Sequence, residues 1–395
     1  MSLPDPTSEV CVLQAAPRRP AAARLLLRVP VEYRVALLFT AVWLGGVAAG
    51  LPVSVPSRDN VQGLEVHFFW PLAIAAGLQL ALTLGLVAAG RRRPGRAPWR
   101  AATTMVQLVP LVALCVFLYF NFKAWTPFVN PVLHDRTYQR LDEVMAPVLG
   151  ALVAVREAVA AAVPLAVDDW YGWLFFAMFF VSLGVHGLVD SPHRQRQLVL
   201  GLCLNLCVGG LSYWVAPAVG PFLFRDGVNE TVLEFQHGWY AAYSEVRATG
   251  AFPEGYFSVP LGAMPSLHVA HSLLFVLFAA RSARWLLAAY VPVFAWIVVE
   301  APASGWHYLV DLPAGVAVAL LSWALATRLV REPARVGDRV ARPTAPVLGA
   351  DHPAGAEPAR RLPARPEPAH AARERGDPLV PVPATRAGAD APLQV

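Results

Sequence analysis

Charged residues are scarce in this chain of 395 residues. They make up 15% of it, against roughly 25% in an ordinary soluble protein. Hydrophobic residues make up 56%, and the mean hydropathy is +0.47. A chain of this kind lacks the polar residues that cover a water-exposed surface. The composition therefore excludes a soluble globular protein and predicts an integral membrane protein.

Lysine and cysteine are also rare. Only one of the 32 cationic residues is a lysine, and most of the arginines stand at the ends of apolar runs or near the C-terminus. This pattern is typical of the orientation signals of a membrane protein, so the net charge of +5 is not interpreted as a nucleic-acid surface. The four cysteines lie mostly within apolar segments, and we expect neither a disulfide framework nor a zinc site.

Long apolar runs predict the fold class, an all-α polytopic bundle of transmembrane helices. A run of about 20 residues can cross a hydrocarbon core of roughly 30 Å as a helix, and we predict about eight such spans. They are 33–53, 67–90, 102–121, 169–190, 197–216, 264–281, 285–301 and 306–329. Arginines precede the first run and no convincing cleavage site follows them, so it is treated as a retained span rather than a signal peptide.

Arginine content predicts the orientation of these spans. The connections at 91–100, 194–196 and 281–284 are rich in arginine, whereas the longer connections on the opposite side have few. Short arginine-rich loops face the cytoplasm. We therefore expect a multi-pass protein of the cell membrane with both termini in the cytoplasm.

The chain divides into three parts by composition. Residues 1–32 are an N-terminal cytoplasmic segment, 33–330 a transmembrane catalytic domain, and 331–395 a tail with 12 of the 36 prolines and no aromatic residue. Such a tail cannot bury enough apolar surface to offset its ordering entropy, so we predict disorder.

Two connections on the predicted outer side have features of ordered structure. Residues 132–165 show apolar side chains at near-helical spacing with charges between them, which predicts an outer amphipathic helix, either a lid or a packing element. Residues 217–263 are rich in glycine, proline and aromatics, with a helix expected at 230–247.

Ionisable residues begin two of the predicted spans, both on the outer side. His268 follows Met264-Pro265-Ser266-Leu267, and His307 stands four residues before Asp311. Such residues are costly in a membrane, so function is the default hypothesis for them. On a helix, Asp311 would reach His307, fix its tautomer and leave the other ring nitrogen with a free lone pair. His268, from another helix, could face His307 across one phosphorus atom and give or take a proton there.

Simpler interpretations of these residues exist. His268 could be an interfacial histidine with satisfied hydrogen bonds, and the pair of His307 and Asp311 could stabilise the start of a helix. A metal site of His268, His271, His307 and Asp311 is a further alternative, but His268 and His271 would diverge by about 60° on an ideal helix. We predict a site without metal and expect no cofactor.

Phosphate contacts are expected from donors and cations on the same side. Pro265 suits the first turn of a helix, so the N–H groups after it, with the Ser266 hydroxyl, would form an anion site. The single lysine, Lys123, and Arg225 are the candidate cations, although Lys123 could equally anchor its helix at the lipid headgroups. Tyr308, beside His307, is included among the candidate substrate contacts.

The histidine motifs resemble those of the type 2 phosphatidic acid phosphatase superfamily. The likeness rests on Gly262–His268, on His307–Leu312 with Gly315 after it, and more loosely on Asn121–Lys123 with Asp135 and Asp142. It covers about residues 100–330. Within the superfamily, Ser266-Leu267-His268 is similar to the branch of inositol phosphorylceramide synthases and related inositolphosphotransferases, where other members have Ser-Gly-His.

The resemblance implies a metal-independent enzyme acting on lipid phosphate esters at the outer leaflet. His307 would be the nucleophile that forms a phosphohistidine, Asp311 its orienting partner, and His268 the general acid and later base. The arginine that often stands six residues before the nucleophile is replaced by Ala301, and the family's motif of Lys and Arg-Pro is not recognisable. The acceptor could be water or an alcohol such as inositol. A non-catalytic protein that binds or transports lipid headgroups is the alternative.

Overall fold

The structure is a computed structural model of the whole chain. It describes residues 29–55, 96–163, 167–253, 256–258 and 261–331, together with the single positions Gly77, Ala81 and Gly85. The predicted span at 67–90 lies largely outside the described residues. The predicted tail and most of the N-terminal segment lie outside them as well.

The predicted all-α bundle is confirmed for the described part of the chain, which contains eleven α-helices and no strand. The helices are α2 (Val31–Ala48), α5 (Arg96–Ala124), α6 (Thr126–Val129), α7 (Asp135–Val144), α8 (Ala146–Ala162), α9 (Trp170–Val189), α10 (Pro192–Ser212), α11 (Glu230–Thr249), α12 (Leu267–Ser282), α13 (Leu287–Ala303) and α14 (Asp311–Leu329). The helix expected at 230–247 is α11, and it begins at the N-cap Asn229, whose side chain accepts the N–H of Val232.

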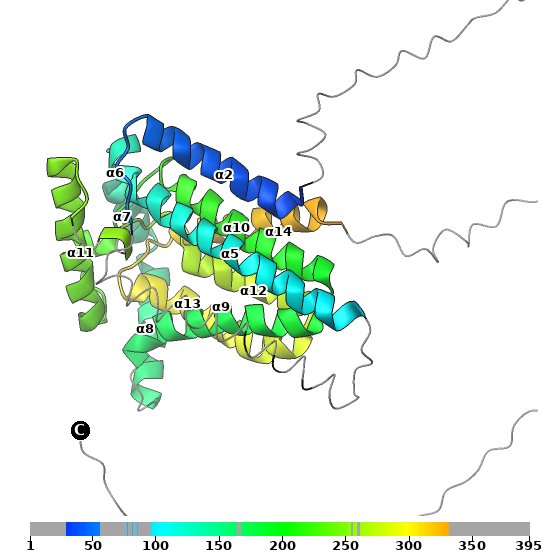
Figure 1. Cartoon of the computed structure of the whole chain (residues 1–395). Coiled ribbons are helices and arrows are strands. Elements are labelled where there is room, and N and C mark those ends of the chain that lie inside the picture. The colour runs from blue at the N-terminus through cyan, green and yellow to red at the C-terminus, as the bar shows by residue number, and fades with distance from the viewer. Residues whose placement is uncertain are drawn as a thin grey trace, which may run out of the picture. The chain divides into compact units, whose positions relative to one another are not determined.

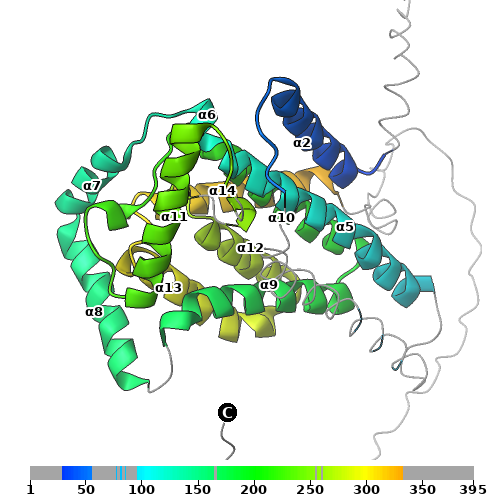
Figure 2. The same cartoon turned by 60° about the vertical axis from the view of Figure 1, so that its left-hand side comes forward.

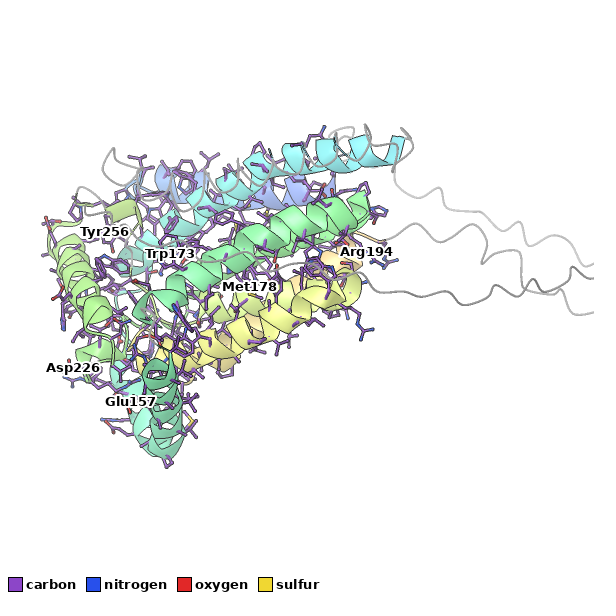
Figure 3. The ribbon with its side chains drawn as sticks, turned by 90° about the horizontal axis from the view of Figure 1, so that it is seen from below. Glu157, Trp173, Met178, Arg194, Asp226 and Tyr256 are labelled. Carbon is purple, nitrogen blue, oxygen red and sulfur yellow. The ribbon has the colours of Figure 1, made fainter. Side chains whose placement is uncertain are left out.

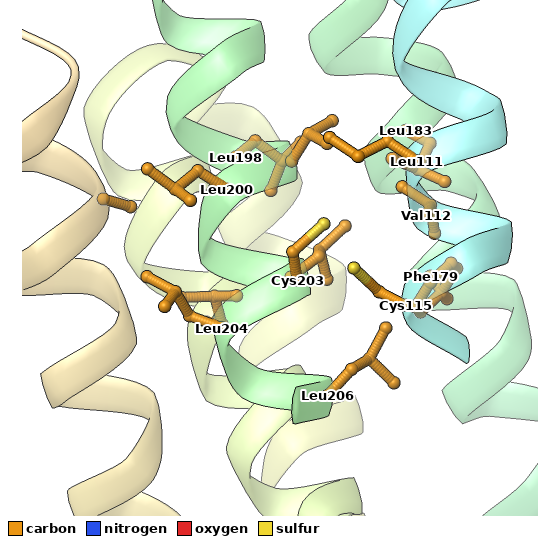
Figure 4. Packing of buried hydrophobic residues seen from close by; sticks show 14 of the residues in the cluster. Leu111, Val112, Cys115, Phe179, Leu183, Leu198, Leu200, Cys203, Leu204 and Leu206 are labelled. Carbon is orange, nitrogen blue, oxygen red and sulfur yellow. The ribbon is translucent and has the colours of Figure 1, made fainter. Parts of the chain in front are cut away.

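Helix α10 is the central element of the bundle. It packs against α2, α5, α12 and α14, and most of its residues are buried (Figure 1). Figure 4 shows Cys203 of α10 and Cys115 of α5 in the apolar layer between these two helices. Both cysteines are free and buried. The core of the bundle is thus built from apolar side chains and thiols, as the composition predicts.

Five described helices are long and apolar enough to cross a membrane, namely α2, α5, α9, α13 and α14. Helices α10 and α12 also lie in predicted spans but are not among these five. The first turns of α10 contain Gln195 and Gln197, whose side chains donate to the carbonyls of Gly187 and Val330. Because α10 is surrounded by other helices, these amides find protein partners in place of water. Helix α12 has only 16 residues.

The described bundle has two different ends. Helices α6, α7, α8 and α11 gather at one end (Figures 1 and 2). Figure 3 shows Trp173, near the start of α9, at this end and Arg194 at the opposite end. Helices α12 and α14, which carry the histidine motifs, begin at the end that α7, α8 and α11 surround.

The amphipathic helix predicted over 132–165 is broken into two helices. Helices α7 and α8 meet at Met145 with a bend of 83°. Buried interactions of the two helices explain the break, because each helix contacts a different part of the bundle. Asp135 and Asp142 of α7 contact loops at the end of the bundle, whereas Arg156 of α8 pairs with the buried Glu300 of α13 at 3.3 Å. The segment packs against the bundle over both halves.

The first residues of α12 and α14 lie directly against each other. The N–H of Ser266, the N-cap of α12, donates to the carbonyl of Asp311 at 3.1 Å. Gly315 makes this approach possible, because a Cβ at this position would stand 2.3 Å from the Ser266 carbonyl oxygen. Because α12 begins at Leu267, Pro265 precedes the helix and is not in its first turn, contrary to the sequence prediction.

A methyl group at Gly315 should push the two helix starts apart. We expect Gly315→Ala to lower the free energy of unfolding by about 1–3 kcal/mol, the usual cost of overpacking. The measurement is the apparent midpoint of thermal unfolding in detergent. Gly184→Ala in α9 is the matched control, because a Cβ there meets no atom within 4 Å. An unchanged midpoint for Gly315→Ala would show that this contact is not tight.

Candidate functional site

A cavity of about 470 Å³ lies among the described helices near the start of α12. Its lining comes from α5, α9, α10, α11 and α12 and from the loops before α12 and α14. Nearly half of the lining residues are Phe, Tyr or Trp, namely Tyr119, Phe120, Tyr171, Trp173, Phe175, Phe176, Phe179, Tyr213, Trp239 and Trp306. His268, His307 and Lys123 line the same cavity, so three residues predicted from three separate sequence segments are brought together.

His307 is held by the backbone on both sides. It lies in the loop between α13 and α14, after Gly305, whose φ of 73° is in the left-handed region. The N–H groups of Trp306 and His307 both donate to the carbonyl of Ala301, at 3.1 Å. This turn brings the chain back from the end of α13 and presents the His307 ring to the cavity.

The tautomer of His307 follows from its two neighbours. Nδ1 lies 2.7 Å from the Ala263 carbonyl oxygen and 3.2 Å from Oδ2 of Asp311. A carbonyl and a carboxylate only accept hydrogen bonds, so Nδ1 must carry the hydrogen. Nε2 then keeps its lone pair. The predicted contact of Asp311 with His307 is present, but His307 lies in the loop before α14 and not on the same helix as the prediction assumed. The Ala263 carbonyl is a second acceptor that the sequence did not indicate.

Asp311 is the first residue of α14 and is fully buried. Its Oδ2 accepts the N–H of Tyr308 at 2.8 Å in addition to facing His307. A carboxylate at a helix N-terminus is stabilised by the helix dipole. Asp311 therefore fixes both the ring of His307 and the backbone of the next residue.

His268 is the second residue of α12, and its ring is enclosed by aromatic side chains. The ring centroid lies 4.6 Å from that of Tyr171 and 4.5 Å from that of Phe175. Within the described residues, neither ring nitrogen has a hydrogen-bond partner. The ring is thus fixed by packing while its nitrogens stay available to a ligand in the cavity.

Lys123 is the only lysine or arginine among the described residues that line the cavity. Its Nζ lies 5.0 Å from the centroid of the Tyr213 ring and 5.9 Å from that of Tyr119. Cation–π contacts of this kind hold an ammonium group without neutralising its charge. The described residues contain no carboxylate in ion-pair contact with Nζ, so its charge can act on an anionic ligand.

Three other predicted substrate contacts are not among the cavity-lining residues. Ser266 is the N-cap of α12, and its hydroxyl accepts the N–H of Val269. Arg225 pairs with Asp142 at 3.3 Å and donates to the Pro302 carbonyl at 3.1 Å. Tyr308 is fully buried.

The four residues considered for a metal site do not form a set of metal ligands. His271 lines the cavity, but its Nδ1 donates to the Leu267 carbonyl at 2.8 Å. No group of three or more His, Cys, Asp or Glu side chains within the described ranges is arranged to hold a metal ion. The geometry therefore offers imidazoles and an ammonium group for anion chemistry.

Two buried carboxylates near the site were not predicted from the residues alone. Asp135 and Asp142 of α7 were interpreted as polar residues of an amphipathic helix, but they are 4% and 1% exposed. Burial raises the pKa of both carboxyl groups above the ordinary value, and hydrogen bonds from backbone N–H groups oppose this shift. Their spacing of seven residues, two helical turns, was the signal that could have revealed them.

The similarity to a known family lies in the second half of the described bundle. Residues 145–325 match the family model of the PAP2 superfamily. No curated protein and no solved structure matches the chain. The matched stretch contains His268, His307 and Asp311, whereas Lys123 and α7 precede it. The match covers less than half of the chain and includes both histidine motifs, so this part of the chain is similar to the PAP2 superfamily.

Proposed function

We propose that this chain is a membrane-embedded enzyme that cleaves lipid phosphate esters through a phosphohistidine on His307. The superfamily match and the apolar helices together suggest a lipid phosphatase-type function. The observation that carries the finer proposal is the environment of His307, whose Nδ1 is anchored by two acceptors while the ring lines the cavity that also holds His268 and Lys123.

In the first step, Nε2 of His307 attacks phosphorus and the bond from phosphorus to the leaving oxygen breaks. Protonated His268 transfers its proton to that oxygen, so the product leaves as a neutral alcohol. The imidazolium character that develops on His307 is stabilised by Asp311. The ammonium group of Lys123 contacts the non-reacting phosphate oxygens, where negative charge gathers in the transition state.

In the second step, His268 removes a proton from the acceptor, whose oxygen attacks the phosphorus of the phosphohistidine. The bond between phosphorus and Nε2 breaks, and His307 regains its lone pair. Water as acceptor gives hydrolysis, and an alcohol such as inositol gives transfer. The likeness of the Ser266–His268 motif to the inositolphosphotransferase branch favours transfer, by analogy.

We further propose that the cavity opens toward the outer leaflet. Arg194, in one arginine-rich connection, lies at one end of the bundle (Figure 3) and donates to the carbonyl of Arg281, in another, at 3.4 Å, whereas α12 and α14 begin at the opposite end. Under the positive-inside rule, the end with Arg194 faces the cytoplasm. The substrate would then be a phospholipid or another lipid phosphate of the outer leaflet.

Replacing His307 should abolish turnover. We expect His307→Ala to reduce phosphate release from a panel of lipid phosphates to background, because among the described residues only His307 both lines the cavity and has a ring nitrogen paired with a carboxylate. The assay uses purified protein in mixed micelles, with His237→Ala as the control because His237 is exposed on α11. Vanadate should inhibit the wild type, and a chelator should not. Equal turnover in His307→Ala, or none in the wild type across the panel, would favour a lipid-binding or transport protein.

Replacing His268 should affect substrates unequally. A general acid contributes about 10²–10⁴-fold, and most where the leaving group is a poor one. We expect His268→Ala to lower kcat strongly for an alkyl phosphate ester and much less for a nitrophenyl ester, whose leaving group needs no proton. The measurement is the dependence of kcat on the pKa of the leaving alcohol. A uniform loss across leaving groups would rule out the acid role.

Activity should require the positive charge of Lys123, and it should also depend on the shape of the group that carries this charge. We expect Lys123→Ala to lower kcat/KM by about 10²–10³-fold, the usual effect of removing one electrostatic contact to a transition state. Lys123→Arg should restore activity only in part, because the planar guanidinium cannot occupy the same place between Tyr119 and Tyr213. Wild-type kinetics in Lys123→Ala would exclude this residue from the site.

A further inference from the structure

Two carboxylates of α7 contact the loop that carries His307 without reaching the cavity. Asp135 and Asp142 are almost completely buried, and neither lines the cavity. Burying a carboxylate is costly unless hydrogen bonds satisfy it. The partners of these two groups therefore indicate what α7 does at this end of the bundle.

Asp135 joins two separate loops. Its carboxylate accepts the N–H groups of Val219 and Gly220, at 3.0 and 2.9 Å, and the hydroxyl of Tyr308 at 2.9 Å. Burial raises the pKa of Tyr308, and the negative charge of Asp135 raises it further, so the hydroxyl stays protonated and donates. Asp135 thus holds the side chain of the residue directly after His307.

Asp142 holds the next residue along the loop. Its Oδ1 accepts the N–H of Leu309 at 2.9 Å, and its Oδ2 lies 3.3 Å from Arg225. Arg225 also donates to the carbonyl of Pro302, in the last turn of α13. Asp142 therefore bonds one end of the loop that carries His307 directly, at Leu309, and contacts the other end, at Pro302, through Arg225.

The connection to His307 runs through a shared oxygen. Oδ2 of Asp311 accepts the Tyr308 N–H at 2.8 Å and faces Nδ1 of His307 at 3.2 Å. A shift of Tyr308 would therefore move the group that orients the His307 ring. Tyr308 is held by its hydroxyl on one side and by its N–H on the other, which leaves it little freedom.

From this arrangement we infer that Asp135, Asp142 and Tyr308 are positioning residues that align His307 from outside the cavity. The inference rests on the proposed function, because it assigns a role in the alignment of the nucleophile. It also gives Tyr308 and Arg225 a different role from the phosphate contact predicted for them. Alignment of a nucleophile is sensitive, since a displacement of about 1 Å can lower a rate by about 10²-fold.

The first test removes single polar atoms and measures kinetics. Tyr308→Phe deletes only the hydroxyl that donates to Asp135, and Asp135→Asn replaces the charged acceptor of that hydroxyl with a neutral, weaker one. We expect each variant to lower kcat by about ten- to hundredfold with little change in KM, because the cavity that binds the substrate is unaltered. The double variant should be no slower than the slower single variant, since both substitutions weaken the same contact between Asp135 and Tyr308.

Two control variants separate alignment from general destabilisation. Glu143→Gln neutralises an exposed carboxylate next to Asp142 on the same helix. Tyr290→Phe removes a buried hydroxyl near the opposite end of α13, where it bonds Ser182 at 2.8 Å. We expect wild-type kcat for both. Wild-type kcat in Tyr308→Phe and Asp135→Asn, or losses that simply add in the double variant, would overturn the inference.

The second test does not depend on activity. Diethyl pyrocarbonate modifies the nitrogen of an imidazole that carries a lone pair, and peptide mapping gives its rate at each histidine. We expect Tyr308→Phe and Asp142→Asn to raise the modification rate of His307 relative to the exposed His237, because the ring loses its fixed orientation. If the wild type turns over no lipid phosphate, the proposed function fails, yet this rate still decides the positioning role. An unchanged rate at His307 in both variants would contradict it.

Discussion

The site depends on the direct contact between the first residues of α12 and α14. A single hydrogen bond, from the Ser266 N–H to the Asp311 carbonyl, joins two helix starts that are 45 residues apart in the chain, and Gly315 leaves the room for it. His268 stands two residues after one partner, and His307 stands four residues before the other. The two imidazoles reach one cavity because the backbones that carry them touch.

The aromatic cavity determines how the charged groups can act. Rings of Tyr, Phe and Trp make up much of the lining, and in such apolar surroundings a charge interacts more strongly with a ligand than it does in water. Among the described residues, one ammonium group, that of Lys123, lines this space over Tyr213 and Tyr119, and the carboxylate of Asp311, which contacts Nδ1 of His307, is not among the lining residues. The arrangement suits a substrate that has one phosphate and a large apolar part.

Much of this architecture could be predicted from the sequence. Apolar runs and arginine placement indicate a helical membrane protein, and the i, i+4 spacing predicts the contact between His307 and Asp311. Periodicity could not predict the break at Met145, because it results from contacts of α7 and α8 with different parts of the bundle. The Ala263 carbonyl that anchors Nδ1 could not be predicted either, since it lies 44 residues away in a loop without regular structure. The phosphate contacts were the least predictable, because Arg225 and Tyr308 are bound by carboxylates of α7.

The central claim is that phosphorus is bound covalently to His307 during turnover. The most direct measurement is mass spectrometry of protein quenched in alkali while it processes a lipid phosphate, since alkali preserves a phosphohistidine. The account predicts a phosphorylated peptide whose modification maps to His307 and which is absent from His307→Ala. A phosphoryl group on another residue, or turnover without any phosphorylated protein when the attack of the acceptor on the phosphohistidine is slowed, would contradict the account.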